Sequence, residues 1–449
     1  MNETKKTIDK KKLVFYIIGI IILIFMVICF MIAFKNYNSN SSSKTTNSNT
    51  NSENSNNISR STITKGGNYN ITGDNSCIVI NTTDSVELSL NNATITCENG
   101  PAINVESAGK LSITLTGENK IVATTTEELD AAIYSKDDLI LSGTGSLSLT
   151  SNYDGIVSKD DLVINGGTYT INSEDDGIKG RDSVQITDGT FNITTGGDGI
   201  KSTNDEDKEK GYITISGGTY IINSINDGIQ AETNLTIKKG TFTIKTTGNA
   251  DNDSAKGLKA VTLVTIEAGT YNINTTDDGI HSDGNITINK GEITINSKDD
   301  SIHADGMVEI NDGTFNITAA EGIEGTYVKI NGGKINISAT DDGINAGNKS
   351  NAYSVKVEIN GGNITIKMGQ GDTDGIDSNG DIYINGGTID ITAQSPFDYD
   401  GTAKYTGGTI IVNGTTTNQI TNQIMGGPGG NMNEGGQSSS NRSQNRGMR

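Results

Sequence analysis

The sequence of 449 residues has no tryptophan, three prolines, three cysteines and two histidines. The absence of tryptophan weakens any hypothesis in which aromatic rings form a platform for sugars. The cysteines show no spacing typical of a zinc or redox motif. Three prolines beside 56 glycines indicate many tight turns and almost no punctuation of helices.

Basic residues are outnumbered as well. The chain has 34 Lys and Arg against 54 Asp and Glu, which gives a formal net charge of −20 and a pI near 4.5. A chain this acidic is not expected to bind nucleic acid. Cations, or anionic ligands bridged by cations, are the expected partners. The alternative is that the charge serves only solubility.

The longest hydrophobic run lies near the N-terminus. Residues 13–34 contain no charge and are long enough to span a bilayer as a helix. The preceding residues, 1–12, hold five lysines, which predicts a cytoplasmic tail and an extracellular C-terminal domain. No small-residue cleavage site follows the run, so an uncleaved single-pass anchor in the cell membrane is favoured over a cleaved signal peptide.

Two segments have the composition of disordered chain. Residues 35–60 are nearly all Asn, Ser and Thr and predict a linker, and residues 416–449 predict a Gly/Asn/Ser-rich tail. Only Cys77 and Cys97 lie outside the predicted membrane span. A disulfide between them and two free buried thiols are both compatible with an extracellular domain.

A short phrase, Asp-Gly-Ile or a near variant, recurs through the middle of the chain. Most repeats are 21 or 22 residues apart, and three are 29, 29 and 32 residues apart. A fixed period of this size is the mark of a solenoid, in which each repeat buries its apolar face against its neighbours. The central residue of the phrase is Gly155, Gly177, Gly199, Gly228, Gly257, Gly279, Ser301, Gly322, Gly343 or Gly375.

The residues between the phrases alternate between apolar and polar, which is the period of a half-buried strand. Three short strands and three turns in about 22 residues predict one coil of a parallel β-helix, over residues 61–415. One predicted inward column runs from Ile164 to Ile384 and another from Tyr169 to Ile389. Strand parity places the aromatic rings in the core. The alternative is a sugar platform.

Stacked rungs place the acids of the phrase about 4.8 Å apart, where they repel unless some are protonated or a cation neutralises them. Oxygen ligands at this spacing favour calcium over zinc or copper. The alternative is that Asp-Gly is only the turn that the coil needs, with Asp hydrogen-bonded to its own backbone. The predicted calcium ligands are Asp154, Asp175, Asp176, Asp182, Asp198, Asp277, Asp278, Asp283, Asp299, Asp300, Asp305, Asp341 and Asp342.

The position after the isoleucine forms a second outward column beside the acids. Calcium beside a lysine could support proton abstraction from a uronic acid, which would make the chain a polysaccharide lyase. The alternative is that the column only balances the acidic charge. The predicted ligand-binding residues in this column are Lys179, Lys201, Lys259, His281 and His303.

The repeat resembles the carbohydrate-binding domain proteins of clostridial surfaces. The resemblance covers roughly residues 60–415 and is carried by Asp-Asp-Gly-Ile-(Lys/His), followed by Val/Ile-x-Ile-Asn-Gly-Gly-Thr-Tyr/Phe. It implies a right-handed, pectate-lyase-like parallel β-helix that binds calcium and an acidic or plant-type polysaccharide without cleaving it. The aspartates of the matching stretches would hold the calcium. The chain departs from the pattern at Lys256 and Ser301.

The sequence therefore predicts an all-β, membrane-anchored cell-surface protein that binds polysaccharide through calcium. A binding protein is favoured over an enzyme. The two rival hypotheses are a calcium-dependent lyase of the pectate type, and a structural stalk or adhesin in which calcium acts as a rivet.

Overall fold

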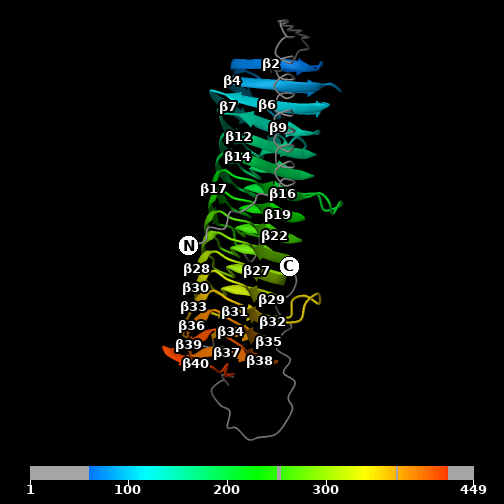
Figure 1. Cartoon of the computed structure of the whole chain (residues 1–449). Helices are drawn as coiled ribbons and strands as arrows, with labels where there is room; N and C mark the ends of the chain where they lie inside the picture. Colours follow the sequence, from blue (N-terminus) through cyan, green and yellow to red (C-terminus); the bar gives the residue numbers. More distant parts are fainter. Residues whose placement is uncertain (1–59, 250–253, 371–372, 423–449) are drawn as a thin grey trace, which may run out of the picture. The chain divides into compact units, whose positions relative to one another are not determined.

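The computed structural model describes residues 60–249, 254–370 and 373–422 (Figure 1). These residues form 40 strands of one continuous sheet. The strands pair in parallel, except that β40 (Thr415–Thr417) is antiparallel to β39 (Thr409–Val412) and closes the C-terminal end. The all-β prediction and the stack of parallel strands are confirmed, and right-handed winding remains a prediction.

Over most of the chain, each strand pairs with the strand three places later in sequence, so one rung contributes three strands and the stack has three faces. Long strands turn a corner and belong to two faces. The first face is made by β1 (Ser61–Ile63), β3 (Ile78–Asn81), β5 (Ile103–Ser107), β8 (Ala131–Ser135), β11 (Asp154–Ser158), β13 (Ile178–Gly180), β15 (Ile200–Ser202), β18 (Ile229–Ala231), β21 (Leu258–Ala260), β24 (Ile280–Ser282), β27 (Ile302–Ile310), β29 (Ile323–Ile330), β31 (Asp342–Ala346), β34 (Asp374–Ser378) and β37 (Ser395–Tyr399).

The other two faces follow the same order along the chain. The second face also includes the ends of β27 and β29, and its other strands are β2 (Gly67–Asn75), β4 (Ser85–Cys97), β6 (Lys110–Thr116), β9 (Leu139–Gly143), β12 (Asp161–Ser173), β14 (Ser183–Thr195), β16 (Tyr212–Ile215), β19 (Asn234–Ile237), β22 (Leu263–Ile266), β25 (Asn285–Ile288), β32 (Lys356–Ile359), β35 (Asp381–Ile384) and β38 (Ala403–Tyr405). The third face holds the ends of β2, β4, β12 and β14, then β7 (Glu118–Ala123), β10 (Ser146–Ser151), β17 (Thr219–Ser224), β20 (Thr241–Thr246), β23 (Thr270–Asn274), β26 (Glu292–Asn296), β28 (Thr314–Ala319), β30 (Lys334–Ala339), β33 (Asn363–Met368), β36 (Thr388–Thr392) and β39.

The predicted segments at the chain ends fall almost entirely outside the described residues. This applies to the tail 1–12, the anchor 13–34, the linker 35–60 and the C-terminal segment 416–449. Within the described ranges, no helix has the length and apolar character that a bilayer span requires.

The interior of the coil is a set of stacked apolar columns. The predicted column from Ile164 to Ile384 is buried throughout, because alternate side chains of each strand point inward. In the second column the rings of Tyr169, Phe191, Tyr220, Phe242 and Tyr271 are stacked face to face, with successive centroids 4.6 to 5.1 Å apart. These aromatics are core residues, so the alternative of a sugar platform is wrong for them.

The glycine of the repeated phrase is needed at the corner before the first face. A Cβ atom at Gly177 would lie 2.6 Å from the carbonyl oxygen of Gly199 and 2.7 Å from Cγ2 of Ile193. At one rung Ser301 takes this position, and its hydroxyl lies 3.1 Å from that of Ser297. Close backbone packing therefore explains the glycine of the phrase. The acid lies at the same corner, directly before this glycine.

The first rungs carry a covalent link. Cys77 and Cys97 form a disulfide, and both residues are buried. The sequence left this pairing open, because spacing alone does not give the geometry. The bond links the residue directly before β3 to the last residue of β4.

Tyr220→Ala is expected to destabilise the coil by about 3–5 kcal/mol, because it removes one ring from the middle of the stack and leaves a cavity. Its neighbour Ile221 points outward and is 47% exposed, so Ile221→Ala should change stability by no more than about 0.5 kcal/mol. Urea unfolding of both variants measures the difference. Equal losses would contradict the assignment of the ring to the core.

Candidate metal centre on the first face

An aspartate ladder runs along the first face. Oδ1 of Asp154 accepts a hydrogen bond of 2.9 Å from the backbone N–H of Asp176, and Oδ1 of Asp176 accepts one of 2.8 Å from that of Asp198. The pattern continues to Asp227 and, further along, between Asp278 and Asp300. The carboxylates are buried, so they need these partners. In these pairs the acid bonds the backbone of the next rung. Asp277 instead accepts a hydrogen bond from the N–H of Asp278 in its own turn, as the turn hypothesis assumed.

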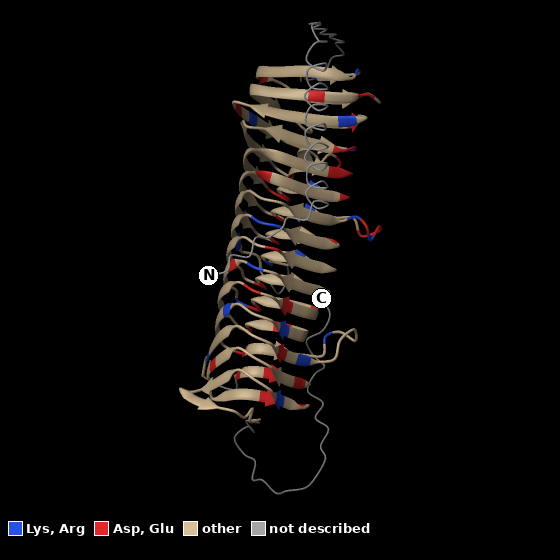
Figure 2. Ribbon diagram, viewed as in Figure 1, with Lys and Arg blue, Asp and Glu red and all other residues tan. Residues whose placement is uncertain are grey.

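Lysines of the outward column neutralise the other carboxylate oxygens. Nζ of Lys179 lies 2.6 Å from Oδ2 of Asp154 and 2.8 Å from Oδ2 of Asp176, and Nζ of Lys201 lies 2.6 Å from Oδ2 of Asp198. Figure 2 shows basic residues interspersed with acidic ones along the stack. The structure therefore has the charge balance that the sequence offered as an alternative.

These ion pairs oppose the lyase hypothesis. Burial disfavours the charged form of Lys179, but the facing carboxylates of Asp176 and Asp154 outweigh it and raise the pKa of the amine above its ordinary value. The pKa of Lys201 is raised in the same way. A general base must be neutral at the working pH. Lys259 is also held near a carboxylate, with Nζ 3.5 Å from Oδ2 of Asp227.

Two groups on this face offer only carboxylate oxygens. In one, ligand atoms of Asp154, Asp175 and Asp176 lie within 4.8 Å of one another, and the other consists of Asp277, Asp278 and Asp299. Hard oxygen donors suit calcium. The first group faces the ammonium of Lys179 and also that of Lys201, whose Nζ lies 3.7 Å from Oδ2 of Asp176. The second group faces the ammonium of Lys256, whose Nζ lies 2.5 Å from Oδ2 of Asp277. We call these the acid-only groups.

Two further groups contain imidazoles. Ligand atoms of Asp278, His281 and His303 lie within 4.8 Å of one another, as do those of Asp300, His303 and Glu324. Burial disfavours the charged form of His281, but hydrogen bonds with Asp278 and Asp283 outweigh it and raise the pKa of the imidazole.

The other predicted ligands lie in three different settings. Asp182 accepts hydrogen bonds from Asn204 and Lys210, at a corner beyond the first face. Asp283 and Asp305 contact the outer nitrogens of the two histidines. Asp341 is exposed and Asp342 is half-buried, and neither belongs to a metal-ligand group among the described residues.

Sequence reasoning missed Glu324 as a site residue. It lies beside His303 in the register of β27 and β29, is 3% exposed, and its Oε2 is 2.9 Å from Nδ1 of His303. The signal was available, because Glu324 follows His281 and His303 in the outward column of the repeat.

The C-terminal rungs of the face concentrate buried acid. Burial raises the pKa of Asp342 to about 8, helped by the charges of Asp377 and Glu321. Burial also raises the pKa of Asp377 to about 7, helped by Asp374 and Asp398. Burial raises the pKa of Asp154 to about 7 as well, although Lys179 faces it, so raised carboxyl pKa values are not confined to the C-terminal rungs.

Fold and face together define a parallel β-helix that presents, along one side, clusters of acidic and histidine side chains that could hold a metal ion. The chain belongs to the family of carbohydrate-binding domain-containing proteins, whose model matches residues 57–301 and 297–426.

A curated relative from Acetivibrio thermocellus, also described as a carbohydrate-binding domain-containing protein, is 33% identical over 124 residues. That match covers 24% of this chain and 43% of the relative, so the chain spans less than half of the relative's length. A solved structure of a polysaccharide lyase-like protein from C. thermocellum, a gadolinium derivative, is 32% identical. That match covers 42% of this chain and 82% of the other, with a TM-score of 0.40.

Asp377→Asn should raise the melting temperature of the metal-free protein more at pH 8.5 than at pH 4.5. The unfolded carboxyl ionises near its ordinary pKa of 3.8 and the folded one near 7, so stability is lost as pH rises between these values. The amide removes that loss.

Thermal unfolding in EDTA at both pH values measures the effect. Asp390→Asn, on the third face, removes the same charge and serves as the matched control. An Asp377→Asn shift that is equal at the two pH values would contradict the raised pKa.

Proposed function

We propose that this chain is a cell-surface protein that binds acidic polysaccharide through calcium. The observation that carries the proposal is the acid-only group of Asp154, Asp175 and Asp176. Its exposed member, Asp175, also lines an open hollow with Asn152, Tyr153 and Glu174. A cation held by the group therefore adjoins a surface recess with polar and aromatic walls.

A calcium ion at this group would need more oxygen ligands than the protein supplies. Calcium takes six to eight oxygen ligands, and three carboxylates supply only part of that number. A uronic acid carboxylate and ring hydroxyls are oxygen donors of the same kind. Bound in the hollow, they would fill the remaining coordination positions. The negative charge of the sugar carboxylate would help to balance the positive charge of the calcium ion.

The lysines set the strength of this binding. Lys179 already neutralises Asp154 and Asp176, and Lys256 already neutralises Asp277. Calcium must share these carboxylates with an ammonium, so we expect weak binding without glycan and tighter binding with it. By thermodynamic linkage, each ligand strengthens the other by the same factor.

The cellular location of the protein is part of the proposal. The uncharged run 13–34 would anchor the chain in the cell membrane, and the linker 35–60 would hold the repeat domain outside. The Cys77–Cys97 disulfide supports an oxidising, extracellular setting. The family supports carbohydrate as the ligand class.

Removing the exposed acid of both acid-only groups, by Asp175→Asn with Asp299→Asn, should weaken calcium-dependent binding to polygalacturonate by at least about tenfold. Asp341→Asn alters the same motif position at a rung outside those groups, and should bind like the unaltered chain.

The measurement is calorimetric titration of calcium into the EDTA-stripped full-length chain, with and without polygalacturonate. Glycan binding that EDTA leaves unchanged would contradict the bridging role of calcium. A melting temperature lowered by EDTA without any glycan binding would favour the structural stalk, and unsaturated sugar products would favour the lyase.

A further inference from the structure

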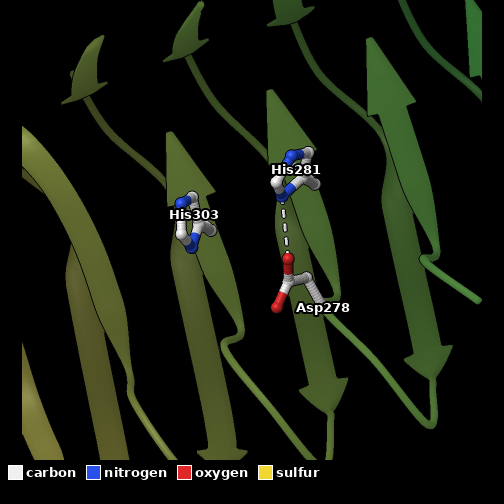
Figure 3. A group of neighbouring side chains, drawn as sticks. All are labelled: Asp278, His281 and His303. Atoms are coloured by element: carbon white, nitrogen blue, oxygen red, sulfur yellow. Dashed lines mark hydrogen bonds and ion pairs between the residues drawn. The ribbon is translucent and has the colours of Figure 1, made fainter. Parts of the chain in front are cut away.

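The only two histidines of the chain lie side by side on the first face. His281 on β24 is the register partner of His303 on β27, and their ring centroids are 5.0 Å apart. Figure 3 shows both rings on the same side of adjacent strands, with Asp278 hydrogen-bonded to His281. From Lys179 to Asp377, the other positions of this column hold lysine or a different polar residue, so these two rungs are chemically distinct.

The inner nitrogens of both rings face buried carboxylates. Nδ1 of His281 lies 2.8 Å from Oδ2 of Asp278. Nδ1 of His303 lies 2.7 Å from Oδ2 of Asp300 and 2.9 Å from Oε2 of Glu324. One imidazole nitrogen carries at most one proton, yet two carboxylates converge on it. A nitrogen and two oxygens around one point form part of a metal coordination shell.

The outer nitrogens have carboxylate partners as well. Nε2 of His281 lies 2.9 Å from Oδ1 of Asp283, and Nε2 of His303 lies 3.4 Å from Oδ1 of Asp305. Histidines that bind metal typically donate their second N–H to a carboxylate, which orients the ring. Arg181 and Thr203 stand at this position after Lys179 and Lys201. A carboxylate therefore stands two residues after each histidine, but not two residues after either of those lysines.

We propose that this cluster binds a divalent transition-metal ion of the zinc type. Imidazole nitrogens select such ions, whereas calcium takes oxygen ligands. The ion would replace the proton of the hydrogen bond between each Nδ1 and its carboxylate. The ligands would be drawn from His281 and His303, with Asp278, Asp300 and Glu324 supplying the oxygens.

The geometry requires little rearrangement. Two donors on one tetrahedral zinc ion are about 3.4 Å apart, so the observed contacts of 2.7 to 2.9 Å need to open by roughly 0.5 to 0.7 Å. The histidine side chains are 14% and 13% exposed, which leaves the ion a path from solvent. This site goes beyond the proposed function, because its ion differs in chemical class from the calcium of the acid-only groups.

The test is a titration of zinc into the EDTA-stripped full-length chain, compared with the double variant His281→Lys with His303→Lys. The variant gives both rungs the lysine that the fold already accepts at positions 179 and 201, so fold and positive charge should be kept. We expect zinc affinity to fall by at least about tenfold in the variant, while calcium uptake persists at the group of Asp154, Asp175 and Asp176, which shares no ligand with the histidine cluster. Equal zinc affinity in the two proteins would overturn the proposal.

A second readout needs no variant. The unaltered chain has only two imidazole rings and therefore only two imidazole Hε1 signals in its proton NMR spectrum, and zinc should shift both. Signals that stay in place while zinc is taken up would overturn the site. Loss of zinc binding in the variant, with calcium still bound at the group of Asp154, Asp175 and Asp176, would support a site separate from that group. Failure of the unaltered chain to bind calcium would count only against the proposed function.

Discussion

The parallel register is the constraint on which the rest of this structure depends. Each residue stacks on its equivalent in the next rung, so any side chain that recurs in the repeat meets its own kind at one strand spacing. For isoleucine and the aromatics this favours packing. For a recurring buried aspartate it would be unfavourable without a neutralising partner. The backbone N–H of the next rung and the interleaved lysines supply that partner.

The same ladder produces different chemistry along the face, because the residue after isoleucine varies. Lysine at this position forms ion pairs with the carboxylates. Histidine keeps nitrogen donors beside them, and the exposed first acid of Asp-Asp-Gly adds an oxygen at the acid-only groups. The scaffold and the proposed ligand sites therefore share one set of aspartates, and Asp154 and Asp176 belong to both.

The sequence predicted the fold well, since period and parity alone place Ile164, Tyr169 and their column partners inside a coil. It did not predict the pairings on the outer surface. Whether Lys179 contacts one carboxylate or two depends on side-chain directions, and the contact of Lys349 with Glu324 depends on a corner insertion that breaks the period. The repeat placed His281 and His303 on adjacent rungs, as the register confirms, but it did not predict the carboxylates that face both rings.

The most direct test of this account is a crystal structure of the chain grown with calcium and an oligogalacturonate, with anomalous difference density to locate the ions. The account predicts calcium at the group of Asp154, Asp175 and Asp176, with a sugar carboxylate among its oxygen ligands at about 2.3–2.6 Å. An oligogalacturonate bound elsewhere without a cation, or carboxylates of this group engaged only with lysine, would contradict it.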